Sequence, residues 1–126
     1  MQSLASLALS PDPNAPGEAR AALRAVPELN PVREDAELVI SELVTNAILH
    51  SGAIKGDEIT VEVLREDDVI RLSVHDPGRS LTSPEVLEPD LDRAGGVGLL
   101  VVSRVAERWL TERPDGVIVW AELSLS

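Results

Sequence analysis

The longest helical pattern in this chain is EDAELVISELVTNAILH, which runs from Glu34 to His50. Good helix formers dominate it, and its apolar residues cover almost the whole circumference of a helix. A helix of this kind is expected to be buried on most of its faces. The stretch therefore predicts a long central helix over residues 34–50, which Ser51 and Gly52 then terminate.

Three polar residues interrupt the apolar surface of this predicted helix: Glu42, Asn46 and His50. Because four residues advance only about 40° around a helix, the three side chains form one stripe. Such a stripe is either a solvent-facing edge of the helix or one wall of a polar pocket. In a pocket, the carboxylate and the amide oxygen could orient a water or a hydroxyl and hold a hard cation. The spacing alone leaves both interpretations open.

The segments around the central helix have the patterns of a small sheet protein. Prolines and glycines separate most of them, an acidic turn over 65–68 joins the two middle strands, and a turn over 114–116 precedes the last strand. Strands are expected at 4–9, 59–64, 69–74 and 117–123, and further helices at 18–26 and 98–109. The sequence thus predicts an α+β fold, a two-layer sandwich of a mostly antiparallel, mixed sheet with two or three helices on one face.

Length, charge and cysteine content limit the possible functions. The chain has 126 residues, so residues 1–126 are expected to form a single domain. Acidic residues outnumber basic ones by 22 to 11, and the net charge of −11 argues against direct binding of nucleic acid. The absence of cysteine excludes a disulfide framework and a thiolate metal site. No apolar run approaches the ~18 residues of a membrane span and no secretory signal is visible, so a cytoplasmic protein without membrane contact is expected.

Two glycine-containing motifs flank a segment without periodicity, residues 75–95. A loop of this length in so small a domain is uncommon and usually functional. The motif DPG at 76–78 follows a predicted strand and is either a plain turn or a place where a carboxylate faces a planar base. The motif GGVG at 95–98 precedes an apolar helix. There, backbone N–H groups and the helix dipole can face an anion; the alternative is a flexible hinge.

The order of these features is more specific than any one of them. A helix with ELVTNA at 42–47, a hairpin, DPG at a strand end, a Pro/Gly-rich loop and GVGL at 96–99 together resemble the GHKL, or Bergerat-fold, ATP-binding superfamily. That superfamily includes gyrase, a heat-shock chaperone, histidine kinases and anti-sigma serine kinases. The segment SELVTNA at 41–47 and the ending GVIVWAEL at 116–123 resemble its small stand-alone branch, the anti-sigma factor serine/threonine kinases.

The resemblance implies roles for individual residues. Glu42 matches the general base of the family, and Asn46 matches its magnesium ligand. Asp76 matches the carboxylate that accepts a hydrogen bond from the adenine amino group, and Gly78 matches the small residue that lets the base approach. ATP and Mg²⁺ are the implied cofactors. The remaining residues expected to bind the nucleotide open the last helix, where two lid glycines lie against the phosphates: Gly96, Val97, Gly98 and Leu99.

Three positions depart from the family pattern within or next to the implied ATP lid, residues 77–95, and on the last strand. Ser80 stands in place of a lid glycine, and Val97 stands where many relatives have arginine. Ile118 has no hydroxyl, although the last strand of relatives often offers one to the nucleotide. These departures favour a member that binds a partner without phosphate transfer, whereas the presence of Glu42 and Asn46 favours a kinase.

The resemblance implies an ATP-binding regulatory protein of the anti-sigma type, a serine/threonine kinase that phosphorylates a small antagonist protein. Its other partner is a sigma factor or an analogous regulator, and because relatives are often dimers, a homodimer is one expectation. The first alternative is a non-catalytic module of the same fold that binds a nucleotide or a partner. The second is a detached histidine-kinase ATPase domain, which requires a phosphoacceptor helix that the sequence does not show.

Overall fold

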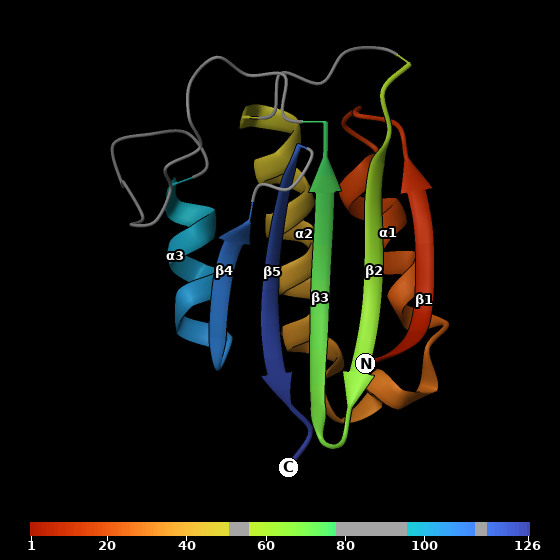
Figure 1. The fold of residues 1–126 in the computed structure, drawn as a ribbon, viewed down its shortest axis with the longest axis vertical. Helices are drawn as coiled ribbons and strands as arrows, with labels where there is room; N and C mark the ends of the chain where they lie inside the picture. The colour runs from red at the N-terminus through yellow and green to blue at the C-terminus, as the bar shows by residue number, and fades with distance from the viewer. Residues whose placement is uncertain (51–55, 78–95, 113–115) are drawn as a thin grey trace.

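The structure is a computed structural model that describes residues 1–50, 56–77, 96–112 and 116–126. Over these residues the chain forms two layers, a five-stranded sheet and three α-helices that cover one face of the sheet (Figure 1). The strand order is β1-β2-β3-β5-β4, and every neighbouring pair is antiparallel. The predicted α+β sandwich is therefore confirmed. The strands comprise β1 (Gln2–Leu9), β2 (Ile59–Glu66), β3 (Val69–Asp76), β4 (Arg108–Glu112) and β5 (Val117–Ser124).

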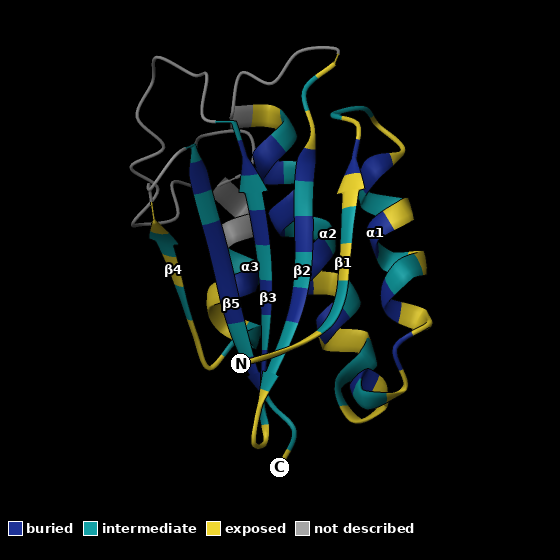
Figure 2. Ribbon diagram, turned by 45° about the vertical axis from the view of Figure 1, so that its right-hand side comes forward, coloured by how far each residue is buried: buried dark blue, intermediate teal, exposed yellow. Residues whose placement is uncertain are grey.

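The core lies between the sheet and the helices α1 (Ala15–Arg24), α2 (Arg33–His50) and α3 (Gly96–Val105). Buried positions follow β2, β3 and β5 and the helix sides that face them (Figure 2). On β2, for example, the buried residues Ile59, Val61 and Val63 alternate with half-buried ones, as the two-residue period of a strand requires. The helix α2 occupies the middle of its layer, where it contacts α1, α3, β3 and β5.

The predicted burial of α2 on most of its faces is confirmed, with one exposed edge. Ile40, Leu43 and Val44 are fully buried, whereas Leu38 and Leu49 are 40% and 53% exposed. The helix therefore presents one narrow side to solvent between its two neighbours in the layer. None of the helices in the described ranges is long and apolar enough to cross a membrane.

The region after α3 differs from the sequence prediction. The sequence predicts one helix over 98–109, but α3 ends at Val105 and, after two intervening residues, the edge strand β4 begins at Arg108. In β4 the half-buried Trp109 and Thr111 alternate with exposed neighbours, and Trp109 lies opposite Ala121 of β5. The apolar spacing of this region fits both the period of a helix, about 3.6 residues, and the two-residue period of a strand. Pairing with β5 satisfies the backbone groups of β4 and so overrides the local helical pattern.

The first helix and the connection that follows it also differ in detail. The sequence predicts a helix from Glu18, but α1 begins at Ala15 with Pro16 in its first turn. A proline is tolerated there because the first helical N–H groups have no partner within the helix. The predicted connection at 27–31 is a 3₁₀ helix, η1 (Pro27–Val32).

Candidate functional site

Four segments come together at one end of the sandwich. The C-terminal end of α2, the end of β3, the start of α3 and the start of β5 all lie at the top of Figure 1. The last residue of β3, Asp76, pairs with the first residue of β5, Val117. The helix α2 contacts both α3 and β3. Asn46, Asp76 and the first turn of α3 belong to these segments.

Asp76 is buried at this end of the sheet, with 6% of its surface exposed. The sequence predicts a loop from His75, but β3 continues through Asp76. Its alternation accounts for the burial, because Ile70, Leu72 and Val74 of the same strand are buried on the face that the helices cover. Two residues after Val74, the carboxylate enters the space between the layers.

Asn46 reaches the same interior from the helical layer and is 7% exposed. It lies on α2 beside the buried Ala47, one turn after Leu43. Its side-chain oxygen Oδ1 is buried and accepts no hydrogen bond from any residue that the structure describes. A buried acceptor without a partner costs about 1–3 kcal/mol, so the position suits an oxygen that a ligand or an ion satisfies.

An amide oxygen of this kind fits Mg²⁺, which prefers oxygen ligands and keeps several of its waters. Within the described ranges, no group of three or more His, Cys, Asp or Glu side chains could hold a metal by itself. Asn46 would therefore supply one ligand, and phosphate oxygens and water would supply the others.

Glu42 and His50 complete the predicted polar stripe of α2. Glu42 is half-buried one turn before Asn46, between the exposed edge of the helix and its interior. Its neighbour Ser41 accepts a hydrogen bond of 2.7 Å from Nη1 of Arg20 on α1. The side chain of His50 lies outside the described residues.

The glycine motifs are described only in part. Gly78 and Ser80, and the segment 78–95 in which they lie, are outside the described residues. The backbone of Gly96, Val97, Gly98 and Leu99 forms the first turn of α3. This turn lies at the same end of the molecule as the end of β3 (Figure 1). The N-terminus of α3 thus directs backbone N–H groups and a positive dipole toward that end.

The sequence places Gly116 in the turn at 114–116 and at the start of the ending that resembles the family, but it does not reveal the contact of Gly116 with Asp76. The φ of Gly116 is +85°, and an ideal Cβ at this position would lie 2.2 Å from the carbonyl oxygen of Asp76. Only glycine combines that backbone conformation with so close an approach. The turn motif at 114–116 explains why a glycine stands at position 116, but it does not indicate that Asp76 is its neighbour.

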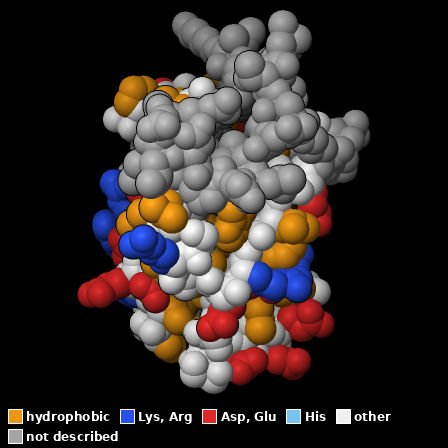
Figure 3. Space-filling view, turned by 90° about the vertical axis from the view of Figure 1, so that its left-hand side faces the viewer, with side chains coloured by type: hydrophobic (Ala, Val, Ile, Leu, Met, Phe, Trp, Pro, Cys, Tyr) orange, Lys and Arg blue, Asp and Glu red, His pale blue; other side chains and the backbone are white. Residues whose placement is uncertain are grey.

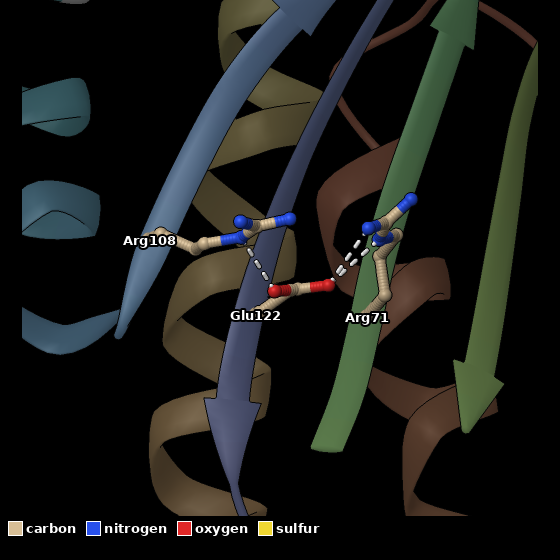
Figure 4. A network of polar contacts seen from close by, with 3 residues as sticks. All are labelled: Arg71, Arg108 and Glu122. Atoms are coloured by element: carbon tan, nitrogen blue, oxygen red, sulfur yellow. Dashed lines mark hydrogen bonds and ion pairs between the residues drawn. The ribbon is translucent and has the colours of Figure 1, made fainter. Parts of the chain in front are cut away.

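A second polar cluster lies on the other face of the sheet. Glu122 of β5 accepts hydrogen bonds from Arg71 of β3, at 2.8 and 3.0 Å, and from Arg108 of β4, at 2.8 Å (Figure 4). The Arg71 guanidinium also lies 3.9 Å from the ring centroid of Trp120. These contacts link three strands and cover Trp120, which is only 5% exposed. They add side-chain contacts to the backbone pairing of β4 with β5.

The α3–β4 side of the molecule carries mixed charges. Basic and acidic side chains are interspersed there with apolar ones over the described residues (Figure 3). Together with the net charge of −11, this distribution gives little attraction for an anion at long range. Local groups at the site must therefore supply any attraction for phosphates.

The features of this end of the molecule agree with a comparison of the whole sequence. Residues 9–123 match the family model of the histidine kinase-like ATPase domain. The chain belongs to this family. It is also 31% identical over 99 residues to the anti-sigma F factor of Clostridium acetobutylicum, an alignment that covers 71% of this chain and 68% of that protein. The histidine kinase-like ATPase match spans α1 to β5 and includes Glu42, Asn46 and Asp76.

Proposed function

We propose that this histidine kinase-like ATPase domain is an anti-sigma-type serine/threonine protein kinase that transfers phosphate from ATP. The observation that carries the proposal is the buried, unpartnered Oδ1 of Asn46 at the end of the fold where Asp76 is also buried. A fold gains nothing from such an oxygen unless a ligand satisfies it. Membership of an ATPase family and the similarity to an anti-sigma F factor support this choice of ligand and reaction.

The proposed site binds the two ends of the nucleotide with different elements. The Asp76 carboxylate, at the end of β3, accepts a hydrogen bond from the adenine amino group. The first turn of α3, which begins at Gly96, directs its N–H groups at the phosphates. A magnesium ion held there would supply positive charge against the phosphates, which matters in a chain of net charge −11. Asn46 is its proposed protein ligand, through Oδ1.

Glu42 is the proposed general base. It lies one turn before Asn46 on the same helix, so the two side chains keep a fixed relation along α2. Glu42 accepts the proton of a serine hydroxyl on the substrate protein as its oxygen attacks the γ-phosphorus. The bond to the bridging oxygen breaks, and ADP leaves with the electron pair. In phosphoryl transfer, such positioning and charge neutralisation supply most of the catalysis.

The proposed partners are a sigma factor, or an analogous regulator, and a small antagonist protein that carries the acceptor serine. The similarity to an anti-sigma F factor supports both. We also propose that the protein forms a homodimer. Of the three departures that favour the alternative function, a binding module without transfer, only Ile118 has a described side chain; it is half-buried on β5 and offers the nucleotide no hydroxyl.

The test of nucleotide binding is calorimetry of the purified protein with ATP, with and without magnesium, together with thermal unfolding. At 100 times its dissociation constant, Mg-ATP should stabilise the native state by about 2.7 kcal/mol. Chelation of magnesium should weaken the binding. The absence of binding heat and of any thermal shift at millimolar Mg-ATP would contradict the proposal.

A further inference from the structure

The turn before β5 touches the end of β3 more closely than a side chain permits. An ideal Cβ on Gly116 would lie 2.2 Å from the carbonyl oxygen of Asp76 and 3.1 Å from the carbonyl carbon of Pro77. It would also lie 3.2 Å from Nε2 of His75. Two of these three atoms belong to the backbone, so rotation of a side chain cannot relieve the contact.

The contact falls on the one strand residue whose carboxylate is buried at the site. Asp76 is the last residue of β3, and its strand partner Val117 directly follows Gly116. Any group larger than hydrogen at position 116 must separate the end of β3 from the start of β5, or rotate the Asp76 peptide. Either change disturbs the backbone at the end of β3, from which the Asp76 side chain extends.

We propose that Gly116 is a positioning residue for adenine recognition, which sets the place of the Asp76 carboxylate by letting the start of β5 lie directly against the Asp76 carbonyl. This inference rests on the proposed ATP site and adds a determinant of base specificity to it. Adenine presents an amino donor where guanine presents a carbonyl acceptor. A well-placed carboxylate therefore favours adenine and repels guanine, and a displaced one loses that discrimination.

Gly56 provides a matched control. It also has a positive φ, +98°, but an added Cβ there would meet no atom within 4 Å. Gly56→Ala thus introduces the cost of a left-handed backbone alone. Gly116→Ala introduces the same backbone cost together with the contact against Asp76.

The experiment measures the dissociation constants of Mg-ATP and Mg-GTP for the wild type, Gly116→Ala and Gly56→Ala. We expect the ATP affinity of Gly116→Ala to fall by about tenfold or more, since a mismatched buried hydrogen bond has this effect. Its GTP affinity should change little, so the preference for ATP over GTP falls. A purely structural defect lowers the competent fraction and weakens both nucleotides equally, which leaves the preference unchanged. Gly56→Ala should keep the wild-type preference.

The double variant Gly116→Ala/Asp76→Asn shows whether Gly116 acts through Asp76. If it does, adding Gly116→Ala to Asp76→Asn should weaken ATP binding by less than about twofold, because residues in contact are not additive. Two full, additive losses would mean that Gly116 acts on the nucleotide by another route, and would overturn the proposal.

A measurement on the wild type keeps the proposal testable if Gly116→Ala does not fold. The amide resonances of Gly116 and Asp76 should shift together during a titration with Mg-ADP and remain in place with inorganic tripolyphosphate, while that of Gly56 does not move. A shift of Asp76 without Gly116 would overturn the inference. If the wild type binds ATP and the Gly116→Ala variant keeps the wild-type preference for ATP over GTP, only the role of Gly116 is refuted. A wild type without ATP binding would refute the proposed function as well.

Discussion

Asn46 of α2 and Asp76 of β3 enter the same end of the fold from opposite layers, and they are the two polar side chains that the described chain buries. The remainder of the described core is apolar, with Ile, Leu and Val predominating. Burial of polar groups in such a core destabilises the protein unless each group has a partner. Oδ1 of Asn46 has no partner among the described residues, so this end of the fold suits a ligand that satisfies it.

Asp76→Asn should reduce ATP affinity by about 10- to 100-fold and leave the fold intact. The two side chains have the same shape, but the amide can present a donor where the adenine amino group needs an acceptor. Such a mismatch costs about 1–3 kcal/mol. Calorimetry with Mg-ATP measures the loss. The exposed Asp68, at the other end of β3, provides the control Asp68→Asn, which should bind ATP as the wild type does. Equal affinities for the two variants would exclude Asp76 from the site.

Asn46→Leu should separate stability from function. Leucine has a similar size and a higher helix propensity, and it removes the buried acceptor that lacks a partner among the described residues. The free energy of unfolding of the nucleotide-free variant should therefore equal that of the wild type or exceed it by up to about 2 kcal/mol. Its unfolding temperature should be the same or higher. Stabilisation by Mg-ATP should largely disappear. A strongly destabilised variant would instead identify Asn46 as a structural residue whose hydrogen bonds hold the helix in place.

Leu43→Ala and Leu38→Ala test the assignment of the buried and exposed faces of α2. Leu43 is 1% exposed, and its truncation should cost about 2–5 kcal/mol. Leu38 is 40% exposed, and the same change there should cost less than about 1 kcal/mol. Urea unfolding of both variants gives the two values. Similar losses at both positions would show that Leu38 is covered in the native protein, for instance by a second subunit.

Most of the fold could be predicted from the sequence because its strands and helices have clear periods. The alternation predicted for 59–64 and for the last strand, 117–123, is confirmed by the burial patterns of β2 and β5. The exception was β4, because five residues whose spacing fits both periods carry no local preference. Its pairing with β5 and the ion pair between Arg108 and Glu122 are tertiary effects that no local pattern reveals.

The members of the candidate site remain predictions from the sequence, and the structure bears only on where their backbone and described side chains lie. Four-residue spacing indicated that Glu42 and Asn46 share a stripe, and the helix confirms their order along one side. Spacing did not indicate that Asn46 would be buried while Glu42 would stay half-exposed. The contact between Gly116 and Asp76 joins residues that are distant in sequence. It arises from the pairing of β3 with β5 and could not be predicted from a local pattern.

Arg71→Ala should expose the ring of Trp120 to water. The guanidinium lies 3.9 Å from the ring centroid and is held there by Glu122. Fluorescence of a Trp109→Phe background, in which Trp120 is the only indole, should shift to longer wavelength on this substitution. Arg108 lies farther from the ring, at 5.1 Å, and its side chain is 65% exposed. Arg108→Ala should therefore give a smaller shift, and a larger one would contradict the cluster as described.

Glu42→Gln should separate ATP binding from phosphate transfer. The substitution keeps the size of the side chain and removes its ability to accept the proton of the acceptor hydroxyl. ATP affinity should stay within about twofold of the wild type, while the transfer rate falls by about 10²–10⁴-fold. Glu34→Gln, on the exposed first turn of the same helix, is the control and should transfer phosphate at the wild-type rate.

The deciding assay incubates the wild type and both glutamine variants with labelled ATP and candidate small antagonist proteins from the same genome. A kinase gives label on the antagonist with the wild type and Glu34→Gln, and almost none with Glu42→Gln. A binding module gives no label with any of them, and all three bind the partner equally well, because the interface then needs no base. Transfer that persists unchanged in Glu42→Gln would support the kinase and remove Glu42 from its mechanism, since the loss of an essential base cannot leave the rate intact.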